Sequence, residues 1–363
     1  KYALFCLACL EFIRQQDWKP DIVHANDWHT ALILHALRTQ MNEANSNMHT
    51  LLTLHNLPYM GGEGSDVLVA YHLEPSQDER LPAWARTQPL PMGLAAADFI
   101  IPVSPQYGKE ILTSAFGCGL ENYLHTRIVD IFGILNGLDE SSFNPGIDER
   151  LNEKFDIANL GKRICNKRAL QKQLDLPEKD ASTLIGMVGR INFQKGIDIA
   201  LGCMEKYMAA DWQFVLLGSG DERLEADASE LQFRFPEQVR IMLGYDEALG
   251  RLIYGGADIF LMPSRYEPCG LAQMIAMRYG CVPIVRATGG LMDTVQEGRT
   301  GFLFEQESVD GMFEAITRAT AEFSNPTRWQ EMQTRCMSQD FSWANSAQKY
   351  RDIYIRLMIR TKA

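Results

Sequence analysis

Long hydrophobic runs and an excess of basic residues are both missing from this sequence, and each absence excludes a class of function. No apolar run approaches the ~20 residues of a membrane-spanning helix. The apolar start, residues 1–10, stops at Glu11 and Arg14, which predicts a packed helix rather than a signal peptide. The net charge of −11 disfavours a general surface for nucleic acid or anionic membranes. We therefore expect neither as a partner, although a local pair of cations can still bind a phosphorylated ligand.

Motifs for metal ions and redox cofactors are also scarce. The eight cysteines are scattered, which favours a reducing compartment. Cys6 and Cys9 form a Cys-x-x-Cys on an apolar helical face without a second pair, so we expect core packing rather than zinc binding. Gly218-Ser219-Gly220 lacks the third glycine of a dinucleotide-binding loop. The sequence thus predicts no metal ion and no cofactor.

Strand-like runs alternate with helical ones, and 363 residues are enough for two domains. The predicted strands are residues 21–24, 50–54, 99–103 and 127–135 in the first half, and 183–188, 213–217, 239–243, 258–262 and 282–285 in the second. Between the halves, residues 139–156 are rich in Ser, Asn, Pro and Asp, which indicates a junction. We predict an α/β protein with two doubly wound, Rossmann-like domains, 1–145 and 146–340, and a closing helix in 341–363.

Charged residues follow two of the predicted buried strands. Arg190 and Lys195 follow one strand in a loop that begins at Gly189, and Glu267 follows another strand. Because ligands of an open parallel sheet bind beyond the carboxyl ends of its strands, these side chains should share one rim. Two cations suit a diphosphate, and a carboxylate suits sugar hydroxyls. The pattern favours an enzyme that takes a sugar from a nucleotide diphosphate. The alternatives are solvated loop charges and a carboxylate that stabilises a helix start.

A family resemblance covers nearly the whole chain. The segments that carry it are 23–30 (VHANDWHT), 53–59 (TLHNLPY), 134–139 (ILNGLD), 190–196 (RINFQKG), 243–245 (LGY), 263–271 (PSRYEPCGL) and 288–291 (TGGL). In this order they resemble the glycogen and starch synthases, which are retaining nucleotide-sugar glucosyltransferases of the GT-B fold. The resemblance implies two Rossmann-like domains facing a central cleft, with the donor bound mainly by the second domain and with the last helix crossing back to the first.

The resemblance also implies roles for individual side chains. Arg190 and Lys195 would neutralise the leaving diphosphate in place of a metal ion, and Glu267 would contact the donor glucose or stabilise a cationic transition state. His55, partly through its backbone carbonyl, and Asp27 would contact the transferred glucose. A helix N-cap is the alternative role for Asp27.

Further contacts are expected around these side chains. Asn56 accompanies His55, Tyr245 resembles the aromatic residue that stacks on the nucleotide base, and Asn136 would contact donor or acceptor. Backbone N–H groups would approach the phosphates at Cys269, Gly270, Leu271, Thr288, Gly289 and Gly290. The alternatives are structural: a part-buried tyrosine, an Asn-Gly turn, a small cysteine at a tight helix start and a plain strand–helix turn.

Two departures from the family are visible. Asn26 occupies a position where the family often has His. In the family, a preceding segment carries a Lys-x-Gly-Gly-Leu loop that approaches the donor phosphates and the glucan, and no such loop occurs here. We therefore expect a truncated first domain.

The expected reaction is transfer of glucose to the non-reducing end of an α-1,4-glucan such as glycogen or starch, with retention. The donor would be ADP-glucose or UDP-glucose, and analogy with bacterial members favours ADP-glucose. Domain closure would exclude water. The expected location is a bacterial cytoplasm, or a plastid in a photosynthetic eukaryote. Three alternatives are a GT-B transferase with another acceptor, such as a sucrose or trehalose-phosphate synthase, a non-catalytic glucan-binding fragment, and a phosphorylase-like enzyme with pyridoxal phosphate.

Overall fold

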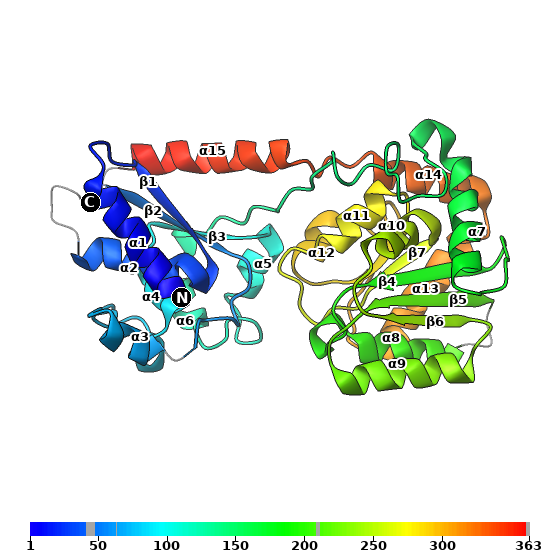
Figure 1. Ribbon diagram of the computed structural model, residues 1–363, viewed down its shortest axis with the longest axis horizontal. Helices are drawn as coiled ribbons and strands as arrows, with labels where there is room; N and C mark the ends of the chain where they lie inside the picture. The colour runs from blue at the N-terminus through cyan, green and yellow to red at the C-terminus, as the bar shows by residue number, and fades with distance from the viewer. Residues whose placement is uncertain (41–47, 63, 208–210, 361–363) are drawn as a thin grey trace. The chain divides into compact units, whose positions relative to one another are not determined.

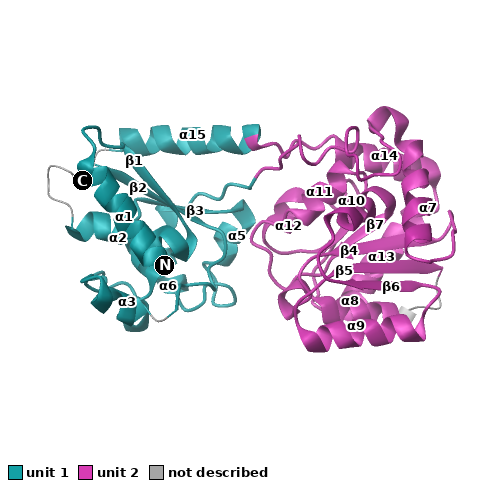
Figure 2. Cartoon of the chain, in the orientation of Figure 1, with its two compact units in different colours: residues 1–136, 344–363 teal, residues 137–343 magenta. Residues whose placement is uncertain are grey.

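The chain folds into two compact units, each with its own parallel sheet (Figure 2). The computed structural model describes residues 1–40, 48–62, 64–207 and 211–360. Unit 1 comprises residues 1–136 and 344–363, and unit 2 comprises residues 137–343. The observed architecture is therefore α/β, as expected, with one sheet in each unit.

Unit 1 contains a three-stranded parallel sheet in the order β1-β2-β3, formed by Ile22–Asn26, His49–Leu54 and Phe99–Pro102 (Figure 1). Every residue of β3 and all but the first of β2 are buried, as is typical of parallel strands that are covered on both faces. Its helices are α1 (Tyr2–Gln15), α2 (Asp27–Gln40), α3 (Gly64–Ala70), η2 (Ala83–Ala85), α4 (Pro89–Ala96), α5 (Pro105–Glu110), α6 (Glu121–His125), η3 (Ile128–Asp130) and α15 (Trp343–Ile359).

Helix α15 packs on the sheet of unit 1 although it is the last helix of the chain (Figure 1). Its Leu357 is fully buried in a cluster with Leu51 of β2 and Phe99 of β3. The hydroxyl of Tyr354 lies 2.8 Å from Nδ1 of His24 on β1. The residues of α15 from Ala344 onward therefore complete the core of unit 1.

The strand predicted at residues 127–135 is wrong in its first half, which forms the short helix η3. The second half lies beside β3: Ile131 bridges to Ile100, and the N–H groups of Phe132 and Ile134 donate to the carbonyls of Ile100 and Pro102 at 3.0 and 2.9 Å. The cause lies in Arg127, whose side chain is buried and donates to the carbonyls of Leu94 and Ala97 at the end of α4 and to the carboxylate of Asp130. These polar partners hold the backbone in a turn instead of an extended run.

Unit 2 contains a six-stranded parallel sheet in the order β6-β5-β4-β7-β8-β9. The strands are β4 (Thr183–Val188), β5 (Trp212–Gly218), β6 (Val239–Leu243), β7 (Ile259–Met262), β8 (Val282–Arg286) and β9 (Phe302–Phe304). The helices are η4 (Ile157–Lys162), α7 (Arg163–Gln173), η5 (Phe193–Lys195), α8 (Ile197–Tyr207), α9 (Glu222–Arg234), α10 (Glu247–Gly256), α11 (Ala272–Arg278), α12 (Gly289–Thr294), α13 (Val309–Phe323) and α14 (Pro326–Met337). The five predicted strands are confirmed to within one residue at each end. The three-residue edge strand β9 was not predicted.

The order of the strands in unit 2 reverses between β4 and β7. The chain first adds β5 and β6 on one side of β4 and then returns to place β7, β8 and β9 on the other side. This is the doubly wound arrangement, in which two helices that leave in opposite directions open a crevice beyond the carboxyl ends of the two central strands. The fold thus creates one favoured binding position in unit 2.

None of the cysteines forms a disulfide bond. All eight are free, and Cys6 is 1% exposed, with its thiol directed at the carbonyl of His29 at 3.5 Å. Burial raises the pKa of the Cys6 thiol to about 11. The predicted core role of Cys6 is confirmed. Among the described residues, no three or more His, Cys, Asp or Glu side chains are grouped so that they could hold a metal ion. No helix in the described part of the chain is long and apolar enough to cross a bilayer.

Candidate active site

The predicted diphosphate-binding loops lie at the reversal point of the unit 2 sheet. β4 pairs directly with β7 through Ile185–Ile259 and Gly186–Phe260. The loop 189–196 follows β4, and the loop 263–271 follows β7. Because both strands end at the same edge, residues more than seventy positions apart in the sequence come into contact there.

Lys195 and Glu267 form an ion pair between Nζ and Oε2. The hydroxyl of Ser264 lies 3.1 Å from the same oxygen and donates to it. Both charged groups are shielded from water, since 21% of the Lys195 side chain and 8% of the Glu267 side chain are exposed. A ligand that places a phosphate beside Lys195 and a hydroxyl beside Glu267 would be bound by both groups.

A single turn of helix fixes the position of Lys195. Asn192 caps the turn η5, and its Oδ1 accepts the backbone N–H of Lys195 at 3.0 Å. Gly196 ends the turn with a φ of +66°, in the left-handed region. A Cβ atom at this position would lie 2.0 Å from the carbonyl oxygen of Pro263, so only glycine lets the two loops approach so closely.

Arg265 clamps the two loops together. Its backbone N–H donates to the carbonyl of Gln194 at 2.8 Å, and its guanidinium donates to the carbonyl of Phe193 at 2.7 Å. The same guanidinium binds both carboxylate oxygens of Asp198, each at 2.8 Å. Burial acts to raise the pKa of Asp198, but the hydrogen bonds from Arg265 outweigh it and leave that pKa below its usual value. Arg265 therefore ties together the two loops that carry Lys195 and Glu267.

The glycine pair after β8 packs against the Glu267 loop. The N–H of Gly290 donates to the carbonyl of Glu267 at 3.0 Å, and a Cβ atom at Gly290 would lie 2.1 Å from the carbonyl oxygen of Cys269. Thr288 and Gly289 are buried beside it at the start of α12. Cys269 is buried, whereas Gly270 is half-buried and Leu271 is exposed where α11 begins. The structure thus brings the two predicted backbone segments together.

A cavity of about 400 Å³ opens at the ends of β4, β5 and β6. Gly189, Arg190 and Tyr245 line it, and the side chains of Arg190 and Tyr245 are exposed. Lys195 and Glu267 do not line this cavity; they lie at the ends of the β4 and β7 loops. The predicted residues of unit 2 therefore form two neighbouring groups, one around the cavity and one around the ion pair, which are joined through the loop 189–196.

Several residues around these groups were not predicted. Ser264, Arg265 and Asp198 support the ion pair without touching the cavity. Arg251 lines the cavity, and the hydroxyl of Tyr279 lies 3.1 Å from the Arg251 guanidinium and 2.5 Å from the carboxylate of Asp148. Ser264 and Arg265 lie inside the PSRYEPCGL segment, so their proximity to Glu267 was the only signal in the sequence.

The predicted residues of unit 1 form their own cluster at the carboxyl ends of β1 and β2. Oδ1 of Asp27 accepts the backbone N–H of His55 at 2.7 Å and that of Asn56 at 3.3 Å. Nε2 of His55 lies 3.1 Å from Oδ1 of Asn26. The carboxylate of Asp27 therefore fixes the end of the neighbouring strand, which is a different role from the helix cap considered above.

Two features of this cluster are unusual for a purely structural arrangement. Asp27 has a φ of +52°, which costs energy in a residue other than glycine and persists where the surroundings enforce it. Oδ1 of Asn56 is buried and makes no hydrogen bond within the described part of the chain. Strain and an unsatisfied acceptor together are typical of a site that a ligand completes.

His24 was quoted in the sequence segment 23–30 but was not assigned a role. It lies between the hydroxyl of Tyr354 and that of Thr53, at 2.8 and 2.7 Å. Burial, with a smaller contribution from the charge of His55, lowers the pKa of His24 to about 4. Asn136, in contrast, is a half-buried residue at the end of unit 1, and its contact with donor or acceptor stays a prediction.

Comparisons with known proteins identify the family. Residues 1–126 match the model of the starch synthase catalytic domain, and residues 166–334 match that of glycosyl transferases group 1. Glycogen synthase 2 of Geobacter metallireducens is 40% identical over 365 residues, which cover 98% of this chain and 75% of that protein. The glycogen synthase of Geobacillus stearothermophilus is 39% identical over 378 residues, which cover 99% of this chain and 76% of that protein.

Solved structures give the same result. The catalytic domain of starch synthase IV from Arabidopsis thaliana, bound to ADP and acarbose, superposes with a TM-score of 0.90 at 33% identity, over 99% of this chain and 77% of that one. Sucrose-phosphate synthase from Thermosynechococcus elongatus shares the fold, with a TM-score of 0.64 at 22% identity, over 97% of this chain and 77% of that one. The chain therefore belongs to the glycogen and starch synthase family of glycosyltransferases and has the GT-B fold of that family.

Proposed function

We propose that this chain transfers glucose from ADP-glucose to the non-reducing end of an α-1,4-glucan, with retention at the anomeric carbon. The observation that carries the proposal is the shielded Lys195–Glu267 ion pair at the point where the sheet of unit 2 reverses its order. The similar starch synthase IV structure contains ADP and acarbose, which supports a nucleotide donor and a glucan acceptor. The glycogen synthases among the relatives support the same acceptor class.

In the proposed reaction, the bond between C1 of glucose and the diphosphate oxygen breaks. The 4-hydroxyl oxygen of the acceptor bonds to C1 on the face that the diphosphate leaves, and its proton passes to the departing phosphate. Lys195 and Arg190 neutralise the charge that develops on the diphosphate, and the carboxylate of Glu267 binds the glucose or stabilises its cationic character. Asp27 and His55 contact the transferred glucose, with Asn56 beside them.

The remaining proposed contacts concern the nucleotide and the acceptor. Tyr245 stacks on the base at the mouth of the 400 Å³ cavity that also contains Gly189. The backbones of 269–271 and 288–290 lie near the phosphates, and Asn136 contacts donor or acceptor. We favour ADP-glucose because the starch synthase IV structure holds ADP. We propose a bacterial cytoplasm as the location because the curated relatives are bacterial, with a plastid as the alternative.

The test is transfer of labelled glucose to glycogen, with ADP-glucose and UDP-glucose compared at equal concentrations. We expect transfer from ADP-glucose, and a loss of about 10²–10³ in rate for Glu267→Gln and for Lys195→Ala. Lys162→Ala is the matched control, because Lys162 also forms an ion pair in unit 2, with Glu153, but lies on the exposed surface. Equal activity of Glu267→Gln and the control would refute the assigned roles, and transfer from UDP-glucose alone would refute the donor.

A further inference from the structure

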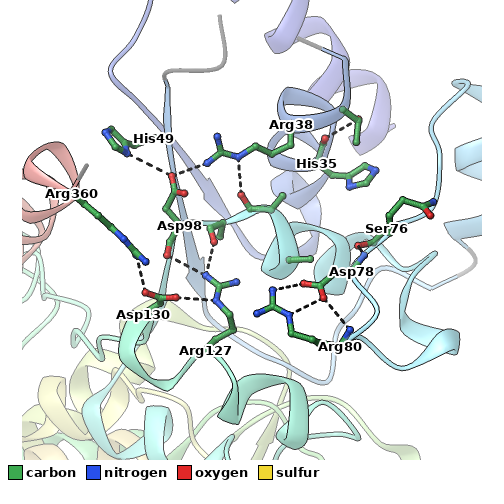
Figure 3. A pocket seen from close by; sticks show the side chains of 15 residues that line it. His35, Arg38, His49, Ser76, Asp78, Arg80, Asp98, Arg127, Asp130 and Arg360 are labelled. Atoms are coloured by element: carbon green, nitrogen blue, oxygen red, sulfur yellow. Dashed lines mark hydrogen bonds and ion pairs between the residues drawn. The ribbon is translucent and has the colours of Figure 1, made fainter. Parts of the chain in front are cut away.

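Unit 1 contains a second cavity, of about 610 Å³, at the amino end of its sheet (Figure 3). His49 is the first residue of β2, and Asp98 directly precedes β3; both line this cavity. Asp27 and His55 lie at the carboxyl ends of β1 and β2 instead. Because the strands are parallel, the cavity is at the opposite edge of the sheet from the unit 1 part of the candidate active site.

The cavity is lined by charged side chains with an excess of cations. The lining includes the arginines Arg38, Arg80, Arg127 and Arg360 and the aspartates Asp78, Asp98 and Asp130. Four arginines against three aspartates give a formal charge of +1 with histidines neutral. The chain as a whole carries −11, so a cationic cavity runs against its general charge.

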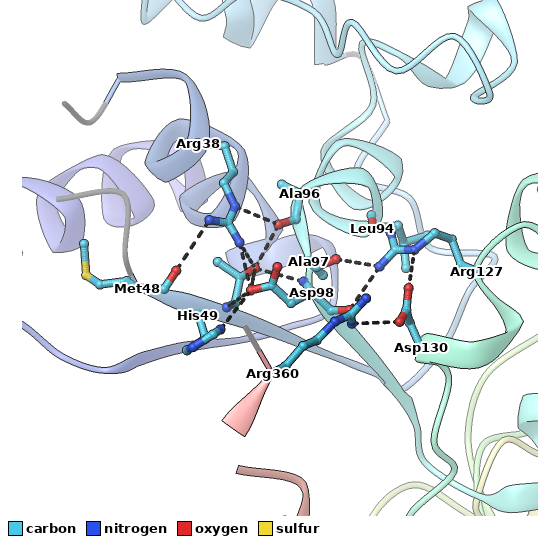
Figure 4. A network of polar contacts seen from close by, with 11 residues as sticks. Arg38, Met48, His49, Leu94, Ala96, Ala97, Asp98, Arg127, Asp130 and Arg360 are labelled. Carbon is cyan, nitrogen blue, oxygen red and sulfur yellow. Dashed lines mark hydrogen bonds and ion pairs between the residues drawn. The ribbon is translucent and has the colours of Figure 1, made fainter. Parts of the chain in front are cut away.

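Two aspartates of the cavity, Asp98 and Asp130, are already bound by protein donors (Figure 4). Oδ2 of Asp98 accepts from Arg38 and from the backbone N–H of Thr50, each at 2.8 Å. Asp130 accepts from Arg127 at 3.0 Å and from Arg360 at 2.8 Å. Their negative charge is therefore compensated locally by arginine partners.

Two of the arginines have structural partners beyond the aspartates. Arg127 donates to the carbonyls of Leu94 and Ala97, and Nε of Arg38 lies 3.4 Å from the carbonyl of Ala96. These carbonyls end α4, where cations are stabilising because the helix dipole is negative there. The contacts with the end of α4 thus give Arg38 and Arg127 a structural role.

In the described part of the chain, neither Arg80 nor Arg360 donates a hydrogen bond to the carbonyls that end α4. Within the described residues, the Arg80 guanidinium donates only to Asp78 and that of Arg360 only to Asp130, so both keep N–H groups for a ligand. Their side chains are 52% and 47% exposed, against 17% for Asp78 and 12% for Asp130. In these two pairs the arginine is therefore more accessible to a ligand than its aspartate.

Arg80 and Arg360 also belong to one electrostatic group. The pKa of Arg80 is raised first by its hydrogen bond to Asp78 and further by the charge of Asp130, the partner of Arg360. Figure 3 shows Arg360 with Asp130 on one side of the pocket and Arg80 with Asp78 on the other, with Arg127 between them. Several guanidinium groups around one space match a dianion with several acceptor oxygens better than a single carboxylate.

We propose that this cavity is a binding site for a phosphate group, presented either by inorganic phosphate or by a small phosphate ester, with Arg80 and Arg360 as its exposed ligands. The cavity is large enough for the organic part of an ester beside the phosphate. The site is independent of the proposed transfer reaction, because none of its lining residues belongs to the candidate active site.

The test is isothermal titration of the protein with inorganic phosphate and, separately, with ribose 5-phosphate, against sodium chloride of equal ionic strength. The titrations are repeated in Lys195→Ala, which removes a cation proposed to bind the donor diphosphate. We expect saturable binding that persists in Lys195→Ala and becomes roughly tenfold to a hundredfold weaker in Arg80→Gln and in Arg360→Gln. Similar affinities would identify the phosphate group as the whole ligand, and much tighter binding of ribose 5-phosphate would identify an ester.

Arg168→Gln is the matched control. Arg168 makes the same two-point contact with Asp180 that Arg80 makes with Asp78, and its exposure is similar at 51%, but it lies in unit 2. Exposed ion pairs contribute little to stability, so all three variants should fold, which their circular dichroism would verify. Absence of saturable binding by either probe would overturn the proposal, as would binding that Arg80→Gln and Arg360→Gln weaken no more than Arg168→Gln does.

Discussion

Replacing Gly290 by alanine should separate the two backbone segments that meet beside the ion pair. The new Cβ would lie 2.1 Å from the carbonyl oxygen of Cys269 and 2.5 Å from its Cα, and backbone atoms cannot rotate away as a flexible side chain can. Overpacking of this kind costs about 1–3 kcal/mol. Loss of the hydrogen bond from Gly290 to the carbonyl of Glu267 adds about 1 kcal/mol. We expect Gly290→Ala to lower the free energy of unfolding by about 2–4 kcal/mol.

Activity should fall further than stability alone requires. The displaced segment carries Glu267, and a shift of ~1 Å in a catalytic group can cost about 10² in rate. Stability would be measured by urea unfolding, and the rate by glucose transfer under conditions in which both proteins are folded. Gly161→Ala is the control, because a Cβ atom there meets nothing within 4 Å. If Gly290→Ala unfolded at the same urea concentration as Gly161→Ala and kept full activity, the packing of the two segments against each other would be refuted.

Two further predictions concern unit 1 and the loop clamp. Burial lowers the pKa of His24 from 6.5 to about 4 in the folded state, so protonation of His24 favours the unfolded state. The contribution of neutral His24 to the free energy of unfolding is complete above about pH 6.5, and about 2 kcal/mol of it is lost by pH 5. Urea unfolding at pH 7 and pH 5 should show this loss in the wild type and in His125→Gln, whose histidine is exposed. In His24→Gln the loss should be smaller by about 2 kcal/mol, and what remains includes buried His35, whose pKa burial also lowers. Arg265→Lys keeps the charge but not the two-point contact with Asp198, so kcat should fall about tenfold with a smaller change in KM. In the same transfer assay, Arg318→Lys on the surface of unit 2 should behave as the wild type; equal kcat values for the two variants would contradict the clamp.

The sequence was sufficient for most of unit 2 because the central strands β4, β5, β7 and β8 are buried almost throughout. The runs at 183–188 and 239–243 were predicted with the bounds of β4 and β6. Strand β9 has only three residues at the edge of the sheet, which is too short for hydrophobic periodicity to reveal.

Polar side chains that bond to distant backbone could not be predicted in the same way. Residues 127–130 contain enough apolar side chains for a strand, yet the partners of Arg127 lie about thirty positions earlier, at the end of α4. Asp27, with a φ of +52°, likewise bonds to the backbone of His55, which directly follows strand β2. In both cases the decisive partner lies far away in the sequence, and no local pattern encodes such a contact.

The same reasoning explains why one site was visible in the sequence and the other was not. Lys195 and Glu267 each lie in the loop that follows a strand, so the rule that parallel strands end at a common edge places both from two local patterns. The cavity of unit 1 draws Arg38 from a helix end, Arg80 from a loop and Arg360 from the end of the chain, and no rule relates these positions before the core is packed. A site that depends on strand ends can be read from sequence motifs, whereas one assembled from scattered surface arginines requires the structure.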